Sequence, residues 1–344
     1  MFNPSKFLFM LTMMSGTMIS ISSNSWLGAW MGLEINLLSF IPLIINSKNP
    51  LSTEAALKYF LIQSFASSVL LFSFVLMQLS NKMILFSYQE ILIILLVSSL
   101  MLKMGAAPFH FWFPGTMEGL SWINCFILMT WQKIAPLVLT SYVIKLNMFL
   151  FIIIISCIIT GSLGGLNQTS LRKFMAYSSI NHLGWMISGM TISEKLWVMY
   201  FIIYSMLNLS IILMLNLHQI SYLSQTYFIM NNQPVKKFYF FTLMLSLGGL
   251  PPFLGFLPKW MLIQALITLN QLLLTTLMVI TTLVTLFYYI RLTFSGFIFS
   301  PLNLKWSSNV TSNNNNNYMM MISILSLISL MGLPMSATFF WFMN

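Results

Sequence analysis

Four charged residues, Glu34, Lys103, Lys133 and Lys259, lie within long apolar stretches of the sequence. A charge at the centre of a bilayer costs at least about 2.5–3.5 kcal/mol on insertion scales, so such residues are functional by default. Burial favours the neutral amine of a lysine, and a nearby carboxylate favours the ammonium form. The pattern predicts proton transfer, with Glu34 and Lys103 as a coupled pair, Lys133 as a central relay and Lys259 as a terminal site.

The alternative role for these charges is static salt bridging. One buried glutamate cannot serve three lysines, so proton transfer is the better interpretation. Two histidines also lie in apolar segments. We predict a relay role for His182, with packing as the alternative, and packing for His110. Cys125 and Cys157 lie in apolar spans without a metal-ligand spacing, so we predict no metal site.

Composition decides the class of protein. Of the 344 residues, 58% are hydrophobic and 6% are charged, whereas soluble domains carry about 25% charged residues. The chain is therefore predicted to be an all-α polytopic membrane protein. Its net charge of +10 comes from cations scattered singly or in pairs, without a basic face, so nucleic acid is not expected as a partner.

Apolar runs with polar punctuation predict about eleven spans. We expect them near 3–22, 25–46, 54–79, 84–119, 123–145, 148–168, 174–190, 196–217, 237–270, 272–299 and 318–343. The fourth and ninth runs would be about 50 Å long as continuous helices, against a hydrocarbon core of about 30 Å. Both contain central Gly and Pro residues, which predict broken helices. The segments 218–237 and 300–317 are expected to be loops.

The two predicted breaks share a motif. The stretches GAAPFHFWFP (105–114) and GLPPFLGFLP (249–258) both read G-x-x-P-F-x-x-x-x-P, at a constant offset of 144 residues. The expected hinge residues are Gly105, Pro108, Pro114, Gly249, Pro252 and Pro258. Five spans separate the copies, so the second would enter the membrane from the opposite side, as in an inverted-topology repeat. Two unrelated proline kinks are the alternative.

This repeat predicts the organisation of the chain. We expect a first five-helix repeat at 1–146, a second and inverted repeat at 147–300, an Asn-rich loop at 301–317 and a last helix at 318–344. The apolar start is expected to be the first span and not a cleaved signal. More cations fall on the side of the N-terminus, which predicts N-terminus inside and C-terminus outside.

Three stretches make the chain recognisable. KMGAAPFHFWFPGTMEGLSW, QTSLRKFMAYSSINHLGW and GGLPPFLGFLPKW resemble the antiporter-like membrane subunits of respiratory complex I, in the eleven-helix form of animal mitochondria. The resemblance covers essentially the whole chain. Many relatives carry Pro-Glu where this chain has Pro114-Gly115, and we do not assign that carboxylate's role to Glu118.

The resemblance implies proton translocation through Glu34, Lys103, Lys133 and Lys259, coupled to NADH:ubiquinone oxidoreduction elsewhere in the complex. It implies no redox centre or cofactor in this chain, with NADH, FMN, iron–sulfur clusters and ubiquinone used by the complex as a whole. The implied partners are other membrane-arm and accessory subunits and the lipid bilayer, with cardiolipin a candidate lipid. The implied location is the mitochondrial inner membrane, with the N-terminus in the matrix and the C-terminus in the intermembrane space. A stand-alone cation/proton antiporter and a structural membrane spacer are the alternatives.

Overall fold

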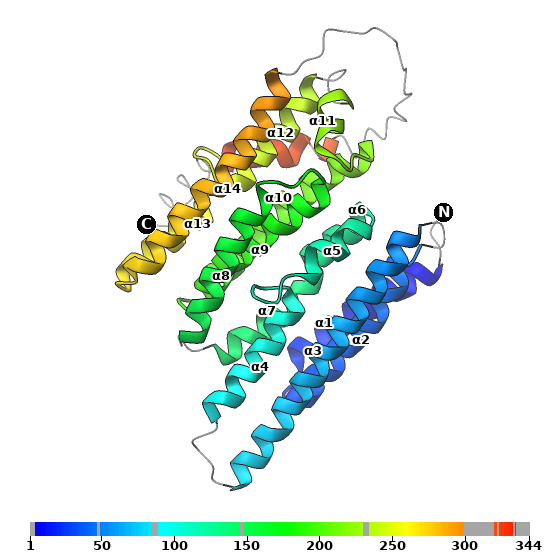
Figure 1. Ribbon diagram of the computed structural model, residues 1–344, viewed down its shortest axis with the longest axis vertical. Coiled ribbons are helices and arrows are strands. Elements are labelled where there is room, and N and C mark those ends of the chain that lie inside the picture. The colour runs from blue at the N-terminus through cyan, green and yellow to red at the C-terminus, as the bar shows by residue number, and fades with distance from the viewer. Residues whose placement is uncertain are drawn as a thin grey trace. The chain divides into compact units, whose positions relative to one another are not determined.

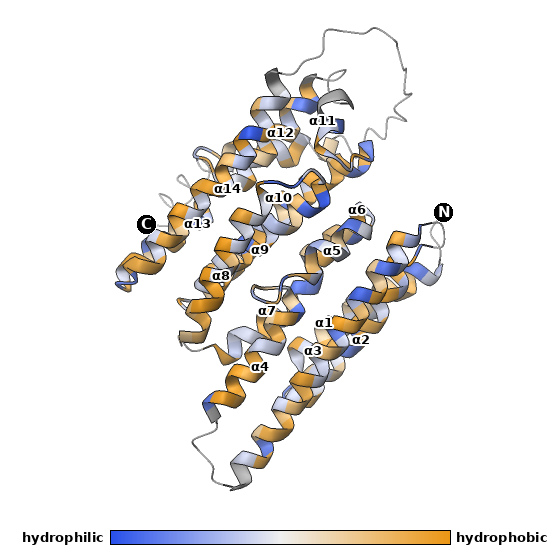
Figure 2. Ribbon diagram, in the orientation of Figure 1, coloured by the Kyte–Doolittle hydropathy of each residue, from blue (hydrophilic) through white to orange (hydrophobic). Residues whose placement is uncertain are grey.

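The protein is a set of packed α-helices in the computed structural model of Figure 1. The structure describes residues 4–46, 49–83, 89–144, 148–229, 234–298, 320–321, 323–332 and 334. Six of the described helices are long and apolar enough to cross a membrane, and apolar residues dominate helices such as α8 (Met148–Gly165) and α14 (Leu272–Ile298) (Figure 2). The predicted all-α membrane fold is confirmed.

The chain divides into two compact units, Met1–Cys157 and Ile158–Asn344. This division falls within α8, while the expected boundary between the repeats is 146/147. The inverted-repeat arrangement stays a prediction. The expected loop at 301–317 lies outside the described residues. Of the last expected span, residues 323–332 are helical.

The described part of the first unit contains seven helices before α8. They are α1 (Pro4–Ser22), α2 (Trp26–Ile44), α3 (Pro50–Met83), α4 (Gln89–Met104), α5 (Trp112–Gly119), α6 (Trp122–Met129) and α7 (Trp131–Val143). Helices α1 and α2 approach closely: a Cβ atom on Gly32 would lie 2.6 Å from the Ser20 amide nitrogen. Small residues at such a crossing let two helix backbones pack directly in lipid.

In the second unit, the described residues up to 298 form six further helices, and residues 323–332 are also helical. The six helices are α9 (Leu171–Met190), α10 (Glu194–His218), α11 (Leu223–Ile229), α12 (Pro234–Gly248), α13 (Phe256–Thr268) and α14. Helix α11 corrects the expectation of a loop at 218–237. The Gln225 side chain accepts hydrogen bonds from the Ser221 and Tyr222 amides, at 2.8 and 3.2 Å, which stabilises the start of this short helix as in a capping box.

Both predicted broken helices are present. Helix α4 ends at Met104 and α5 begins at Trp112, while α12 ends at Gly248 and α13 begins at Phe256. Pro114 and Pro258 lie in the first turns of the second half-helices and not in the breaks, because a helix lacks intrahelical partners for its first N–H groups and so accepts proline there.

Each first half-helix ends in the same hydrogen-bonding pattern. Gly105 and Gly249 have φ values of +73° and +83°. The Gly105 and Ala106 amides donate to the Leu102 and Met101 carbonyls, at 3.2 and 3.0 Å. The Gly249 and Leu250 amides donate to the Ser246 and Leu245 carbonyls, at 3.0 and 3.4 Å. Both are Schellman motifs, which place glycine at the first position past the helix.

The second break is closed by an unusually tight contact. A Cβ atom built on Gly255 would lie only 1.8 Å from the carbonyl oxygen of Ser246, in the last turn of α12. No other residue type fits there without displacing backbone. Gly255 therefore fixes the start of α13 against the end of α12.

We expect Gly105→Ala to destabilise the protein by about 1–2 kcal/mol, because an L-residue is disfavoured at positive φ and the new Cβ would lie 3.1 Å from Phe113. Gly115→Ala is the matched control. Gly115 is helical with open space around its Cβ direction, so alanine should be neutral or stabilising by up to about 1 kcal/mol. Thermal unfolding midpoints of the two purified variants measure the difference. Equal midpoints would contradict the prediction.

The fifth span differs from the continuous helix expected at 123–145. It is divided into α6 and α7 at Thr130, whose φ and ψ are −117° and −70°. The Lys133 amide donates to the Thr130 carbonyl at 3.1 Å, a tight-turn bond, and Pro136 offers no N–H to the turn before it. Lys133 thus lies directly after a helix distortion.

Candidate proton-transfer site

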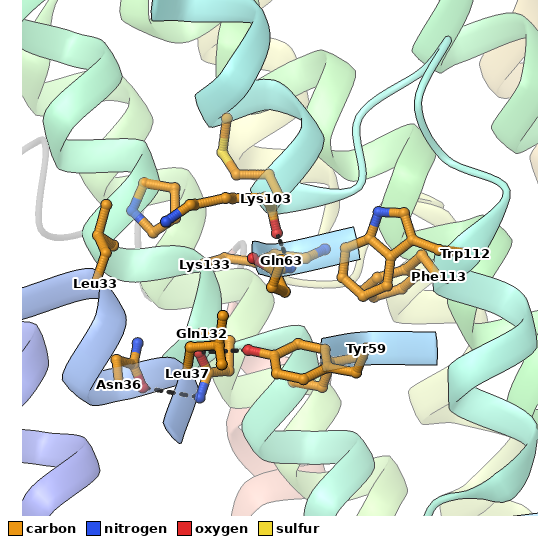
Figure 3. A pocket seen from close by; sticks show the side chains of 13 residues that line it. Leu33, Asn36, Leu37, Tyr59, Gln63, Lys103, Trp112, Phe113, Gln132 and Lys133 are labelled. Carbon is orange, nitrogen blue, oxygen red and sulfur yellow. Dashed lines mark hydrogen bonds between the residues drawn. The ribbon is translucent and has the colours of Figure 1, made fainter. Parts of the chain in front are cut away.

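A small cavity in the first unit is lined by two of the predicted lysines, Lys103 and Lys133 (Figure 3). The space open to the centres of water molecules is about 20 Å³. One water needs about 10–15 Å³ of such space and two to four polar partners. The cavity can therefore hold a single water molecule between polar side chains.

Neutral polar side chains form a hydrogen-bonded row along this cavity. The Tyr59 hydroxyl of α3 donates to Gln132 Oε1 at 3.3 Å, and Gln132 Nε2 donates to Asn36 Oδ1 of α2 at 3.0 Å (Figure 3). Tyr59 and Asn36 are each 3% exposed. The row joins α2, α3 and α7. Its central residue, Gln132, directly precedes Lys133 in the sequence.

Lys103 occupies the last turn of α4, at the carboxyl end of the first half-helix. It is buried. The negative end of the helix dipole favours a cation there. Two carbonyls at this end of the helix accept hydrogen bonds from side chains. Gln63 Nε2 donates to the Lys103 carbonyl at 3.0 Å, and Trp112 Nε1 donates to the Leu102 carbonyl at 3.1 Å.

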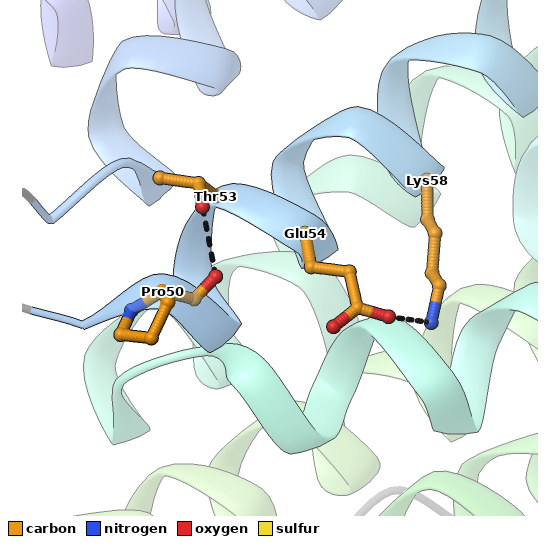
Figure 4. Close-up of polar contacts among 4 residues, drawn as sticks. All are labelled: Pro50, Thr53, Glu54 and Lys58. Carbon is orange, nitrogen blue, oxygen red and sulfur yellow. Dashed lines mark hydrogen bonds and ion pairs between the residues drawn. The ribbon is translucent and has the colours of Figure 1, made fainter.

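Glu34 lies half-buried on α2. Within the described residues it forms no ion pair within 4.0 Å with Lys103. An ion pair that the chain does form, Lys58 Nζ to Glu54 Oε1 at 2.6 Å, lies on the exposed face of α3 (Figure 4). Glu34 and Lys103 therefore lack the fixed contact of a static salt bridge, and their coupling stays a prediction.

Lys133 is 1% exposed, among the most buried large side chains of the chain. Its Nζ lies 4.8 Å from the centroid of the Phe113 ring, within the range of a cation–π interaction. Phe113 belongs to the first turns of α5, directly after the first break. The break thus positions the aromatic face that contacts the central lysine.

Lys259 lies in the second unit and is also buried. It occupies the first turns of α13, and its Nζ donates to the carbonyl oxygen of Gly248, the last residue of α12, at 2.8 Å. A lysine is less favourable at a helix amino end than at a carboxyl end. The bond to the α12 carbonyl compensates by linking the two half-helices across the break.

The histidines have different surroundings. His182, buried in α9, has Nδ1 2.8 Å from the Tyr200 hydroxyl, and its ring centroid lies 5.1 Å from that of Tyr204. His110 lies in the first break and packs against Phe111, with ring centroids 4.4 Å apart. His182 therefore has a hydrogen-bonding partner in the Tyr200 hydroxyl.

The first unit thus brings Lys103 and Lys133 to one cavity, while Lys259 and His182 lie in the second unit. Sequence reasoning missed four neutral residues of the cavity: Asn36, Tyr59, Gln63 and Gln132. The available signal was polar residues inside apolar spans, which is weaker than a charge because amides and hydroxyls occur in many membrane helices.

Replacing Gln132 by leucine should destabilise the first unit by about 1–3 kcal/mol, since the buried Asn36 and Tyr59 groups lose their shared partner. The same change at Gln78, which is exposed on α3, is the control and should have little effect. Thermal unfolding midpoints of both variants provide the measurement. A Gln132→Leu variant as stable as Gln78→Leu would show that the row contributes nothing.

These features define a class: a polytopic membrane protein with buried lysines beside broken helices. The family model described as NADH:quinone oxidoreductase/Mrp antiporter, TM, matches residues 23–285, more than half of the chain. The chain belongs to this family. Curated relatives described as NADH-ubiquinone oxidoreductase chain 2 are 54% identical in Anopheles gambiae (95% of this chain, 96% of the relative) and 50% identical in Locusta migratoria (98% and 97%).

Solved structures share the fold at lower identity. A chain of respiratory complex I from Thermus thermophilus with bound aureothin superposes with a TM-score of 0.79 at 22% identity, covering 96% of this chain and 80% of that one. A chain of the Mrp complex from Dietzia sp. gives 0.72 at 16% identity, covering 84% and 59%. At these identities the likeness concerns the fold alone.

Proposed function

We propose that this chain is a proton-translocating subunit of the membrane arm of respiratory complex I. The curated relatives that it matches over nearly their full length carry the name of a complex I subunit. The proposal that the chain moves protons is supported above all by the cavity of the first unit. There Lys103 and Lys133 line a space for one water molecule beside a broken helix. Water in such a cavity can pass a proton between two amines that are not in direct contact.

We assign roles to the buried charges by their surroundings. Glu34 tunes Lys103 by its charge, since the two lie in the same unit without a fixed ion pair between them. Lys133 is the central relay, because it is nearly inaccessible yet lines the same cavity. In the second unit, Lys259 is the distal proton site, and His182 with Tyr200 is a further exchange point.

The broken helices supply fixed backbone polarity for these sites. Unwound backbone at membrane depth is tolerated where it lines a protein-enclosed or hydrated space. Gly105 and Pro108, with Gly249 and Pro252, are the proposed hinge positions within the breaks, and the two halves are proposed as inverted repeats. The matching Schellman motifs at an offset of 144 residues support that assignment.

The chain acts within an enzyme whose electron transfer takes place in other subunits. In this proposal NADH, FMN, iron–sulfur clusters and ubiquinone are bound elsewhere in the complex, and this chain moves protons. Its partners are other membrane-arm and accessory subunits and the lipids of the mitochondrial inner membrane, cardiolipin among them. The excess of cations on one side supports an N-terminus in the matrix and a C-terminus in the intermembrane space.

Copurification and proton uptake together test this proposal. The native chain, isolated under mild detergent, should migrate with a large assembly that oxidises NADH with ubiquinone. The assembly reconstituted into vesicles should acidify or alkalise the lumen in step with NADH oxidation. A chain recovered alone and active in Na⁺/H⁺ exchange would favour the stand-alone antiporter. A chain in the assembly whose buried lysines can be replaced without any change in pumping would favour the structural spacer.

A further inference from the structure

A second and larger cavity lies in the second unit, and none of the proposed proton-transfer residues lines it. It has about 270 Å³ of space open to the centres of water molecules, and its lining residues include Phe174, Tyr288, Leu292 and Arg291. Most of this lining is aromatic or aliphatic, while Arg291 adds a guanidinium group. The cavity is thus amphipathic, with an apolar body and one permanent cation.

Arg291 is exposed, two turns before the end of α14. One of its terminal nitrogens donates to the Leu166 carbonyl at 2.6 Å, which orients the planar guanidinium. Within the described residues Arg291 forms no ion pair with a carboxylate. A guanidinium carries five N–H donors, so most of its capacity remains available to an anion.

Hydrogen bonds join the loops around this cavity into one end of the unit. The Leu171 amide donates to the Ser221 carbonyl at 2.9 Å, and the Leu223 amide donates to the Thr169 carbonyl at 3.0 Å. These bonds join the start of α9 to the end of α10 and the start of α11. The start of α12 belongs to the same end, since α12 begins at Pro234, shortly after α11 ends at Ile229.

This end of the second unit is strongly basic. Its described charged side chains are Arg172, Lys173, Lys236, Lys237 and Arg291, and its described part contains no Asp or Glu. The acidic residue of the unit's described part, Glu194, begins α10 at the opposite end of that helix. Such a basic end attracts the headgroups of anionic lipids, by about 1 kcal/mol for each cation near the surface.

We propose that this cavity binds one anionic phospholipid, whose phosphate contacts Arg291 and whose acyl chain packs against Phe174, Tyr288 and Leu292. The planar fork of arginine matches phosphate oxygens in a bidentate manner. The apolar lining favours a hydrocarbon chain over water. This site is independent of the proton-transfer residues, and its occupancy is expected to hold the loop at 166–170 against α14.

A photoactivatable anionic phospholipid, added to the purified and delipidated native complex, tests the site. Crosslinks found by mass spectrometry should fall on residues of α9 and α14 that line the cavity. Excess unlabelled phosphatidylglycerol should compete, while phosphatidylcholine and inorganic phosphate should not. Competition by inorganic phosphate alone would identify a site for soluble anions, and equal competition by phosphatidylcholine would indicate a non-selective hydrophobic groove. Either result would overturn the proposal.

Variants at Arg291 make the test specific. Arg291→Gln should lower crosslinking by about fivefold, the value of one cation near the membrane surface, and Arg291→Lys should retain part of it. Lys195→Gln, at an exposed position near the start of α10, removes one charge from the opposite end and should leave crosslinking unchanged. If Arg291→Gln fails to assemble, the Arg291→Lys variant and the competition profile of the native complex still test whether the cavity binds an anionic phospholipid. Unchanged crosslinking in both Arg291 variants would contradict the site.

Discussion

Replacing Lys133 by methionine is expected to lower proton translocation by about 100-fold or more, the lower range for loss of a positioned acid–base group. The subunit should still assemble, because removing a buried charge relieves an insertion cost of about 2.5–3.5 kcal/mol. The measurement is the pH change inside vesicles that contain the complex, driven by NADH and ubiquinone, with subunit content determined on the same preparation.

Lys133→Arg separates proton transfer from a static charge. Arginine keeps the positive charge and the contact with the Phe113 ring but does not release its proton. We expect this variant to be as defective as the methionine variant. Lys58→Met and Lys58→Arg are the matched controls on the exposed face of α3, and both should pump normally. Full pumping by Lys133→Arg would mean that the charge alone matters.

Lys259→Met is expected to have two separate effects. Proton translocation should fall to a similar extent as for Lys133, and the second unit should lose about 1–3 kcal/mol because the Gly248 carbonyl loses its buried donor. Vesicle pumping assays and thermal unfolding midpoints measure the two effects on the same preparation. A variant that loses stability alone would assign Lys259 a purely structural role.

Lys259→Arg should separate these effects. An arginine can still donate to the Gly248 carbonyl, so the unfolding midpoint should recover most of its wild-type value. Pumping should stay low, because the side chain no longer releases a proton. Recovery of both properties together would show that the hydrogen bond across the break, and not proton release, is what the complex requires.

The helices were largely predictable because apolar runs are long and polar punctuation is sparse. The breaks at Gly105 and Gly249 could also be foreseen, since glycine and proline recur at matching positions in runs too long for one membrane span. The division at Thr130 could not, because a threonine six residues before a proline carries no comparable signal. Helix α11 was missed because it is only seven residues long and its start depends on the local Gln225 contacts.

The candidate site was predictable only in its charges. Lys103 and Lys133 stand out because a cation in an apolar span is rare and costly, and the structure brings both to one cavity. The row of Tyr59, Gln132 and Asn36 depends on three helices meeting in one register, which spacing along a single chain does not encode. The pairing of Glu34 with Lys103 stays a prediction, because no ion pair joins the two among the described residues.

The contact of Gly255 with Ser246 restricts how the second unit can move during turnover. A sliding of α13 along α12 would have to lift the Gly255 backbone off the Ser246 carbonyl, with the Lys259 bond to Gly248 breaking in the same step. Gating in this region is therefore expected to come from rotamers and from the arrival and departure of water. Proton transfer in the second unit would then be controlled by water molecules and side-chain rotamers, while the backbone keeps its conformation.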